Sequence, residues 1–171
     1  MNKIILSTLV LLFTITGFAQ TKVGTVDSEY ILSQMPELAE VQKSLDEYGK
    51  DLEKQLGEKV TSYEKVIEAA KTAFETMSDA EKQAKQEEIA GLQQDITTFR
   101  NNASQLVQLK QGDLLRPLYT KIGEQIDAYS KANSFTHILN TSTGATVAYL
   151  DPAYDITLAV IEKMGIVIKK N

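Results

Sequence analysis

The sequence predicts an α+β fold, in which a small β-rich body carries a long antiparallel α-helical coiled-coil hairpin. Three observations lead to this prediction. Residues 37–131 contain a single proline and repeat apolar residues at spacings of three and four, as amphipathic helices do. The sequence Ser78-Asp79-Ala80-Glu81 in the middle of this stretch is typical of a helix start. Short β-branched segments lie on both sides of the stretch, so the strands come from opposite ends of the chain.

The first nineteen residues are typical of a secretory signal peptide. Lys3 gives a positive start, residues 4–15 form an apolar run, and Gly17 and Ala19 supply the small residues for cleavage after Ala19. An uncleaved membrane anchor is the alternative, but the apolar run is short for a membrane span. The sequence has no cysteine, so packing or assembly has to stabilise the exported chain.

The composition argues against several classes of function. The net charge of −5 does not suit nucleic acid, whose phosphates require clustered Lys and Arg. One His and no Cys make a zinc site improbable, and the sequence contains no glycine-rich loop for a nucleotide. Neighbouring acids such as Glu87 and Glu88 have no nucleophile, base partner or metal nearby in the sequence. We therefore expect neither an enzyme nor a cofactor.

The first part of the body is expected at residues 20–36. Residues 21–26 alternate and contain β-branched side chains, which predicts a strand. A short helix over residues 29–34 follows, with either Asp27 or Ser28 as its N-cap. Pro36 ends this helix and suits the first turn of the next one.

The second part of the body is expected at residues 132–171. Residues 135–140 and 145–150 each have strand composition, and a turn at residues 142–144 predicts that they pair as a β-hairpin. The final helix is expected over residues 156–164, with Asp155 as its cap and Gly165 as its stop.

The helical hairpin is expected over residues 37–131, with its tip near residues 77–80. The first arm has a seven-residue apolar repeat that is interrupted by an eleven-residue step between Leu52 and Tyr63, so we expect a fairly straight coiled coil. Pro117 lies in the returning arm and should kink it. Pro117 and Gly123 are therefore candidate hinge residues.

So few strands leave open sheet edges, and the simplest remedy is assembly of several copies of the chain. The number of copies does not follow from this argument. The candidate subunit contacts are apolar residues of the expected strands, namely Val23, Val26, Ile138, Leu139, Val147 and Tyr149.

Three segments follow the pattern of a known family. They are KVGTVDSEYILSQMPE near the start, RPLYTKIGEQIDAYSKANSFTHILN at the end of the returning arm, and YDITLAVIEKM near the end of the chain. Through these segments the chain resembles the Skp (OmpH-like) family of periplasmic chaperones. The resemblance implies a jellyfish-shaped homotrimer whose arms enclose a cavity. It also implies an ATP-independent holdase that receives unfolded outer-membrane β-barrel proteins in the periplasm, without catalytic residues to transfer.

Five apolar residues of the outer hairpin have two interpretations. They either fill the seam between the two helices, as apolar residues at helical spacing usually do, or face the cavity and bind client chains. These candidate client-binding residues are Tyr63, Phe74, Met77, Ile89 and Phe99.

The charge of the hairpin departs from the strongly basic members of that family. Residues 37–131 hold 13 Lys and Arg against 18 Asp and Glu, which argues against a lipopolysaccharide site and favours apolar client contacts. The alternative function is a coiled-coil structural or adaptor protein of the bacterial envelope that has one specific partner.

Overall fold

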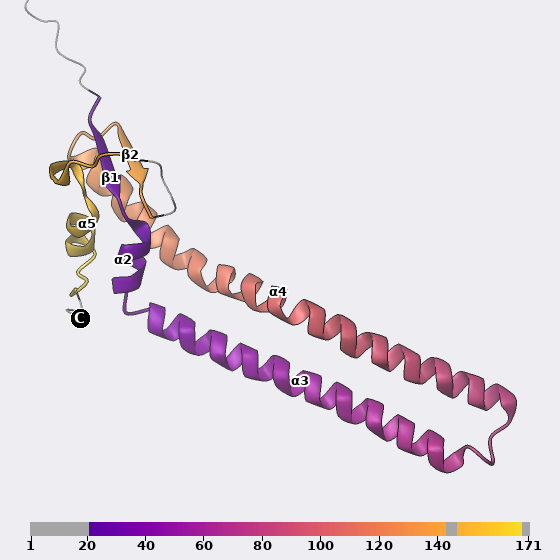
Figure 1. Cartoon of the computed structure of the whole chain (residues 1–171). Helices are drawn as coiled ribbons and strands as arrows, with labels where there is room; N and C mark the ends of the chain where they lie inside the picture. The colour runs from indigo at the N-terminus through magenta and orange to yellow at the C-terminus, as the bar shows by residue number, and fades with distance from the viewer. Residues whose placement is uncertain (1–20, 143–146, 169–171) are drawn as a thin grey trace, which may run out of the picture.

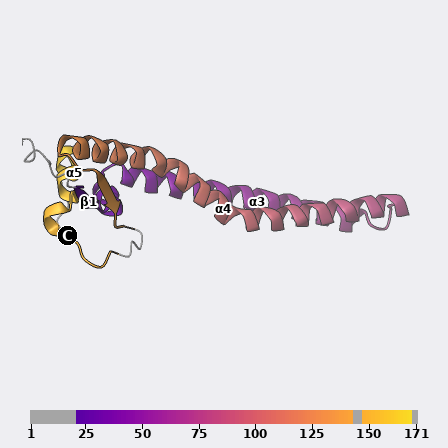
Figure 2. The same cartoon turned by 90° about the horizontal axis from the view of Figure 1, so that it is seen from above.

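The structure is a computed structural model that describes residues 21–142 and 147–168. The predicted α+β fold is confirmed: two long helices form a hairpin that projects from a small body (Figures 1 and 2). The predicted signal peptide lies outside the described residues. The elements are β1 (Val23–Val26), α2 (Ser28–Gln34), α3 (Leu38–Ala73), α4 (Asp79–Ala132), β2 (His137–Asn140), the 3₁₀ helix η2 (Pro152–Tyr154) and α5 (Thr157–Lys163).

The sheet of the body consists of two parallel strands, β1 and β2. Val23 is opposite His137 and Val26 is opposite Asn140, so the entire hairpin forms the connection between the strands. The other edge of β1 is also occupied, because the backbone N–H of Ile156 donates to the carbonyl of Thr25 at 2.9 Å. The first strand thus lies in the middle of the small body.

The predicted β-hairpin between residues 135–140 and 145–150 is wrong for the part that the structure describes. Residues 147–150 form no strand, and residues 143–146 lie outside the described residues. The outer edge of β2, where such a hairpin would add its second strand, is unpaired among the described residues. The chain instead contacts the sheet again at the far edge of β1, through Thr25 and residues 155–156. The alternating pattern of residues 145–150 could not reveal at which edge of the sheet the chain would return.

The core of the body joins the two ends of the chain to the base of the hairpin. The core cluster includes one almost completely buried side chain from each of three helices: Ile31 from α2, Ile122 from α4 and Val160 from α5. Near the base of α3, Val41 belongs to the same cluster. The body-side end of α4 is therefore an integral part of the body, and the rest of the hairpin is the arm that projects from it.

The helix ends follow the local sequence closely. The carboxylate of Asp27 accepts a hydrogen bond from the backbone N–H of Tyr30 at 2.9 Å, so Asp27 is the cap of α2. At the tip, the Ser78 hydroxyl accepts from the N–H of Glu81, and the Glu81 carboxylate accepts from the N–H of Ser78. This reciprocal capping box confirms the helix start that the sequence indicates.

Two helix boundaries differ from those expected. The first arm ends at Ala73, so the turn at the tip covers residues 74–78 and begins before the predicted one. The last helix begins at Thr157, whose N–H donates to Asp155 at 2.9 Å, and it ends at Lys163. Pro117 does not end its helix, and α4 continues through it as one helix of 54 residues.

The arm has little buried surface of its own. At about 1.5 Å per residue, the 36 residues of α3 extend over about 54 Å. Beyond the body, Leu52 and Ile96 are the only apolar side chains of the described arm that are classed as buried. None of the helices in the described residues combines the length and apolar character that a membrane crossing requires.

Candidate functional site at the arm tip

A groove lies at the arm tip, where α3 ends and α4 begins. It has a volume of about 440 Å³ and its apolar lining consists of Ile67, Ala70, Phe74, Met77 and Ile89. Three of these residues, Phe74, Met77 and Ile89, are among the five candidates that the sequence indicated. The structure therefore brings three of those candidates together in one concave, apolar site.

The helix ends explain why the groove is open. Phe74 follows the last residue of α3 and lies in the turn, with 55% of its side chain surface exposed. The capping box at Ser78 then starts α4 in the opposite direction. The figures show no third element over the tip (Figures 1 and 2). A large aromatic side chain is thus held at the surface by the turn geometry.

The rim of the groove carries more positive than negative charge. Lys71, Lys82 and Lys85 line it, against Glu75. Lys71 forms an ion pair with Glu68 at 3.9 Å, and Lys85 pairs with Glu88 at 2.6 Å.

The third lysine of the rim has a different partner. The ammonium group of Lys82 lies 4.8 Å from the centroid of the Phe74 ring, which is a cation–π contact. Among the described residues, no carboxylate lies within ion-pair distance of Lys82. Lys82 is therefore the one rim lysine in the described residues whose charge is not compensated by an ion pair, and it stands beside the apolar groove.

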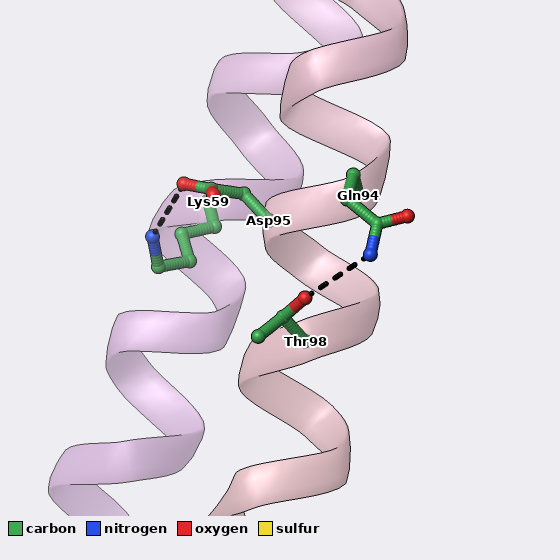
Figure 3. A network of polar contacts seen from close by, with 4 residues as sticks. All are labelled: Lys59, Gln94, Asp95 and Thr98. Atoms are coloured by element: carbon green, nitrogen blue, oxygen red, sulfur yellow. Dashed lines mark hydrogen bonds and ion pairs between the residues drawn. The ribbon is translucent and has the colours of Figure 1, made fainter.

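The other two candidates, Tyr63 and Phe99, do not line the groove. Both are half-buried along the arm, and the ammonium group of Lys59 lies 5.7 Å from the Phe99 ring centroid. Lys59 also reaches across from α3 to Asp95 of α4, with a distance of 3.4 Å between Nζ and Oδ2 (Figure 3). This level of the arm fits the seam interpretation, because its side chains connect the two helices.

Sequence reasoning did not single out Ile67, Ala70 or Lys82 for the site. A signal was present, because Ile67, Ala70 and Phe74 follow the three- and four-residue spacing of one helix face. Lys82 stands in the first turns of α4, directly after the cap. Its proximity to Phe74 depends on the shape of the turn, which spacing does not specify.

The candidate subunit contacts divide into exposed and buried residues. Val23 and Leu139 are exposed, and Tyr149 is 79% exposed, so these three offer surface to another chain. Ile138 packs against the core and Val147 is half-buried. Val26 is only 2% exposed, because its side chain fills the core of its own chain, and its role as a subunit contact stays a prediction.

The two candidate hinge residues lie on the body-side end of α4. Pro117 and Gly123 are exposed, whereas Leu118 and Ile122 between them are buried in the core. Any bending at this position has to keep those two side chains packed. The hinge stays a prediction, and its position is inside the body and not between body and arm.

Two polar pairs connect α4 to the base of the arm. The Tyr119 hydroxyl donates to Glu29 at 2.6 Å, and this hydrogen bond raises the pKa of Tyr119 to about 12. Lys121 donates to Glu37 at 2.9 Å, and this hydrogen bond holds the pKa of Glu37 below its usual value. The first pair connects α4 to α2, and the second connects α4 to the residue that precedes α3.

The site contains groups for binding but not for metal chemistry. Within residues 21–142 and 147–168, no three His, Asp or Glu side chains are grouped as a metal site requires. His137 lies exposed on β2, and its Nδ1 is 3.2 Å from the hydroxyl of Thr136. What the tip offers chemically is an apolar surface with cations at its edge.

Comparisons with known proteins agree with this architecture. A crystal structure of a candidate OmpH-like outer membrane chaperone from Caulobacter crescentus CB15 is 16% identical in sequence, covers 91% of both chains and has a TM-score of 0.63. At this identity the likeness shows the fold alone. A search of curated protein sequences finds no match. The sequence model of a family described as outer membrane protein (OmpH-like) matches residues 22–164, from the first strand to the last helix. The chain therefore belongs to the OmpH-like family.

Proposed function

We propose that this protein is an ATP-independent holdase chaperone of the periplasm, which binds unfolded outer-membrane β-barrel proteins and prevents their aggregation. The observation that carries the proposal is the exposed apolar groove at the end of an arm that stands clear of the body. Membership of the OmpH-like family supports it, as does the description of the Caulobacter crescentus protein as a candidate outer membrane chaperone.

Holding an unfolded chain requires no chemical step. An apolar client segment that leaves water for the groove is stabilised by burial alone, at about 25 cal/mol per Å² of apolar surface. Phe74, Met77 and Ile89 would provide this surface at the tip. Because one groove buries only a small area, each contact is weak, and a client would be held by many contacts that exchange rapidly.

Several copies of the arm are needed to surround a client, and we propose a homotrimer. The body supports assembly because it exposes large apolar side chains, namely Val23, Leu139, Tyr149, Leu150, Tyr154, Leu158 and Val167. Where exposed apolar side chains gather on one face, they mark an interaction site. The outer edge of β2 is also unpaired among the described residues, and it offers backbone groups to another chain.

The proposal includes export to the periplasm through residues 1–19, with cleavage after Ala19. It includes no lipopolysaccharide site, since Asp and Glu outnumber Lys and Arg in the hairpin and disfavour an anionic surface.

The test is native mass spectrometry of the purified protein, alone and after dilution of a urea-unfolded outer-membrane β-barrel protein into it without nucleotide. We expect a trimer that takes up one client, and light scattering that stays low. A trimer that leaves the client to aggregate would instead support an adaptor with one specific partner. A monomer in both experiments would contradict the assembly.

A matched pair of variants connects the activity to the tip. Phe74→Ala removes an exposed aromatic side chain from the groove, and Leu109→Ala removes a similarly exposed side chain from the middle of α4. If the groove holds clients, Phe74→Ala weakens the suppression of aggregation and Leu109→Ala leaves it close to normal. Equal effects of both substitutions would count against a role of the tip.

A further inference from the structure

We propose that the groove at the arm tip binds a specific kind of client segment: one large apolar side chain with an Asp or Glu carboxylate two residues away in the sequence. This inference deepens the proposed holdase function and rests on it, because the ligand is part of a captured chain. The holdase function alone requires only that the groove binds apolar surface without sequence preference. The inference adds a preference for one kind of client segment.

The apolar half of the preference follows from the lining. The groove volume of about 440 Å³ falls within the range in which proteins bind small ligands, roughly 300–1,000 Å³. Phe74 supplies an exposed ring at its edge, and Met77 supplies a flexible thioether that adapts to different shapes. Such a lining accepts one aromatic or large aliphatic side chain without demanding one residue type.

The charged half follows from Lys82. Its ammonium group lies 4.8 Å from the Phe74 ring centroid, so a cation stands beside the surface that the apolar side chain would cover. The other two lysines of the rim already pair with Glu68 and Glu88. Lys82 is half-buried, and a carboxylate that reaches it is screened less by salt than one on an open surface.

The spacing of the two groups follows from the geometry of an extended chain. Successive side chains of such a chain point to opposite faces, whereas side chains two residues apart share one face and lie about 6.6 Å apart. Because the Lys82 ammonium group lies 4.8 Å from the Phe74 ring centroid, a client can cover Phe74 with one residue and pair with Lys82 through the second residue along.

Charge also argues against the tip of a second copy as the occupant of the groove. Two grooves facing each other would bring together two Lys82 ammonium groups, which have no ion pair in their own chain among the described residues, and like charges repel. A segment with a carboxylate complements this rim, whereas another copy of it does not.

The test is an NMR titration of the protein with synthetic unstructured peptides, observed through the methyl groups of Met77 and Ile89. One peptide, the Phe-Asp peptide, contains a single Phe and, two residues later, an Asp. A second has Lys in place of that Asp, and a third has Ala in place of that Phe. We expect the first peptide to shift both methyl signals. The second peptide loses the ion pair with Lys82 and the third loses the apolar contact with the groove, so each should bind at least about three-fold more weakly.

Variants separate the two halves of the site. Phe74→Ala should weaken binding of the Phe-Asp peptide by about ten-fold, as for a central contact of an interface. Lys82→Gln should weaken it by about three-fold and reduce its salt dependence, with little effect on the Phe-Lys peptide. Lys50→Gln is the control, because it removes the same charge from an exposed position of α3 outside the groove.

Four results would overturn the inference. Equal binding of the Phe-Asp and Phe-Lys peptides would remove the charge preference, and shifts spread along the arm would remove the groove. Shifts caused by sodium decanoate but by none of the peptides would assign the groove to a lipid. Shifts that grow with protein concentration alone would assign it to a second copy. Aggregation suppression that persists in any of these cases leaves the holdase function standing and rejects only the segment preference.

Discussion

The ring of Phe135 lies against Gly24 so closely that a Cβ atom on residue 24 would be 2.7 Å from Cε1 of the ring. The same ring lies 4.0 Å below the ammonium group of Lys22 and is tilted against Tyr129 of α4, with 6.4 Å between the two ring centroids. Glycine at position 24 is therefore what allows the first strand to pass over the segment that follows the arm.

Gly24→Ala should destabilise the body. The added Cβ would also be 2.9 Å from Cδ1 of Ile138, so two side chains have to move at once. Overpacking of this kind costs about 1–3 kcal/mol. Urea denaturation followed by circular dichroism measures the loss.

Gly112→Ala is the matched control for this substitution. Gly112 lies inside α4, and a Cβ there meets nothing within 4 Å. Alanine should stabilise the helix by up to about 1 kcal/mol, since glycine is the poorer helix former. If Gly24→Ala were as harmless as Gly112→Ala, the close approach of Phe135 would be wrong.

Ile122→Ala should be among the most damaging substitutions in α4. Ile122 is 1% exposed and packs in the cluster that also holds Ile31 and Val160. Deleting a buried isoleucine side chain to alanine costs about 2–5 kcal/mol, because it leaves a cavity. Thermal unfolding should shift strongly for Ile122→Ala, whereas Leu109→Ala, at a position with 59% exposure, should stay within about 0.5 kcal/mol.

The hydroxyl of Tyr119 should titrate at a higher pH than the ordinary value for tyrosine. Its hydrogen bond to Glu29 raises its pKa from 10.0 to about 12. A raised pKa stabilises the fold fully below pH 10, and this contribution is lost as the pH rises from 10 towards 12. An alkaline titration of tyrosinate absorbance should lose a step near pH 12 in Tyr119→Phe. An unchanged step near that pH in the variant would contradict the assignment to Tyr119.

Ser78→Ala should loosen the tip without melting the body. The Ser78 hydroxyl accepts from the N–H of Glu81 and completes the capping box of α4. Loss of an N-cap side chain costs about 1 kcal/mol, which corresponds to roughly five-fold faster amide exchange in the first turn. Hydrogen exchange measures this locally. Ser104→Ala, at an exposed position inside α4, should leave the exchange at the tip unchanged.

The parts of the fold that the sequence predicted well are encoded locally. Ser78 and Glu81 predict the start of α4, because both partners of the capping box lie within one turn of helix. The apolar spacing of α3 likewise predicted a helix, and Asp27 was one of the two caps considered for α2. Each of these signals acts over a few residues, so it is visible without knowledge of the tertiary structure.

The parts that could not be predicted depend on residues far apart in the chain. After β2 the chain contacts the sheet again at the far edge of β1, where Ile156 donates to Thr25, and residues 147–150 do not pair with the free edge of β2. At the tip, the apolar stripe indicated Phe74 and Met77, but only the turn brings Lys82 to the Phe74 ring. Pairing between strands and contacts across a turn are not periodic, and composition carries little information about them.

The sparse seam of the arm has a consequence for how the molecule tolerates change. Because the core that holds the fold together ends at the base of the hairpin, whole helical turns could be added to or deleted from both arms with little effect on the stability of the body. The reach of the arm is thus a property that evolution can adjust separately from folding, and the position of the tip groove sets the distance over which it acts.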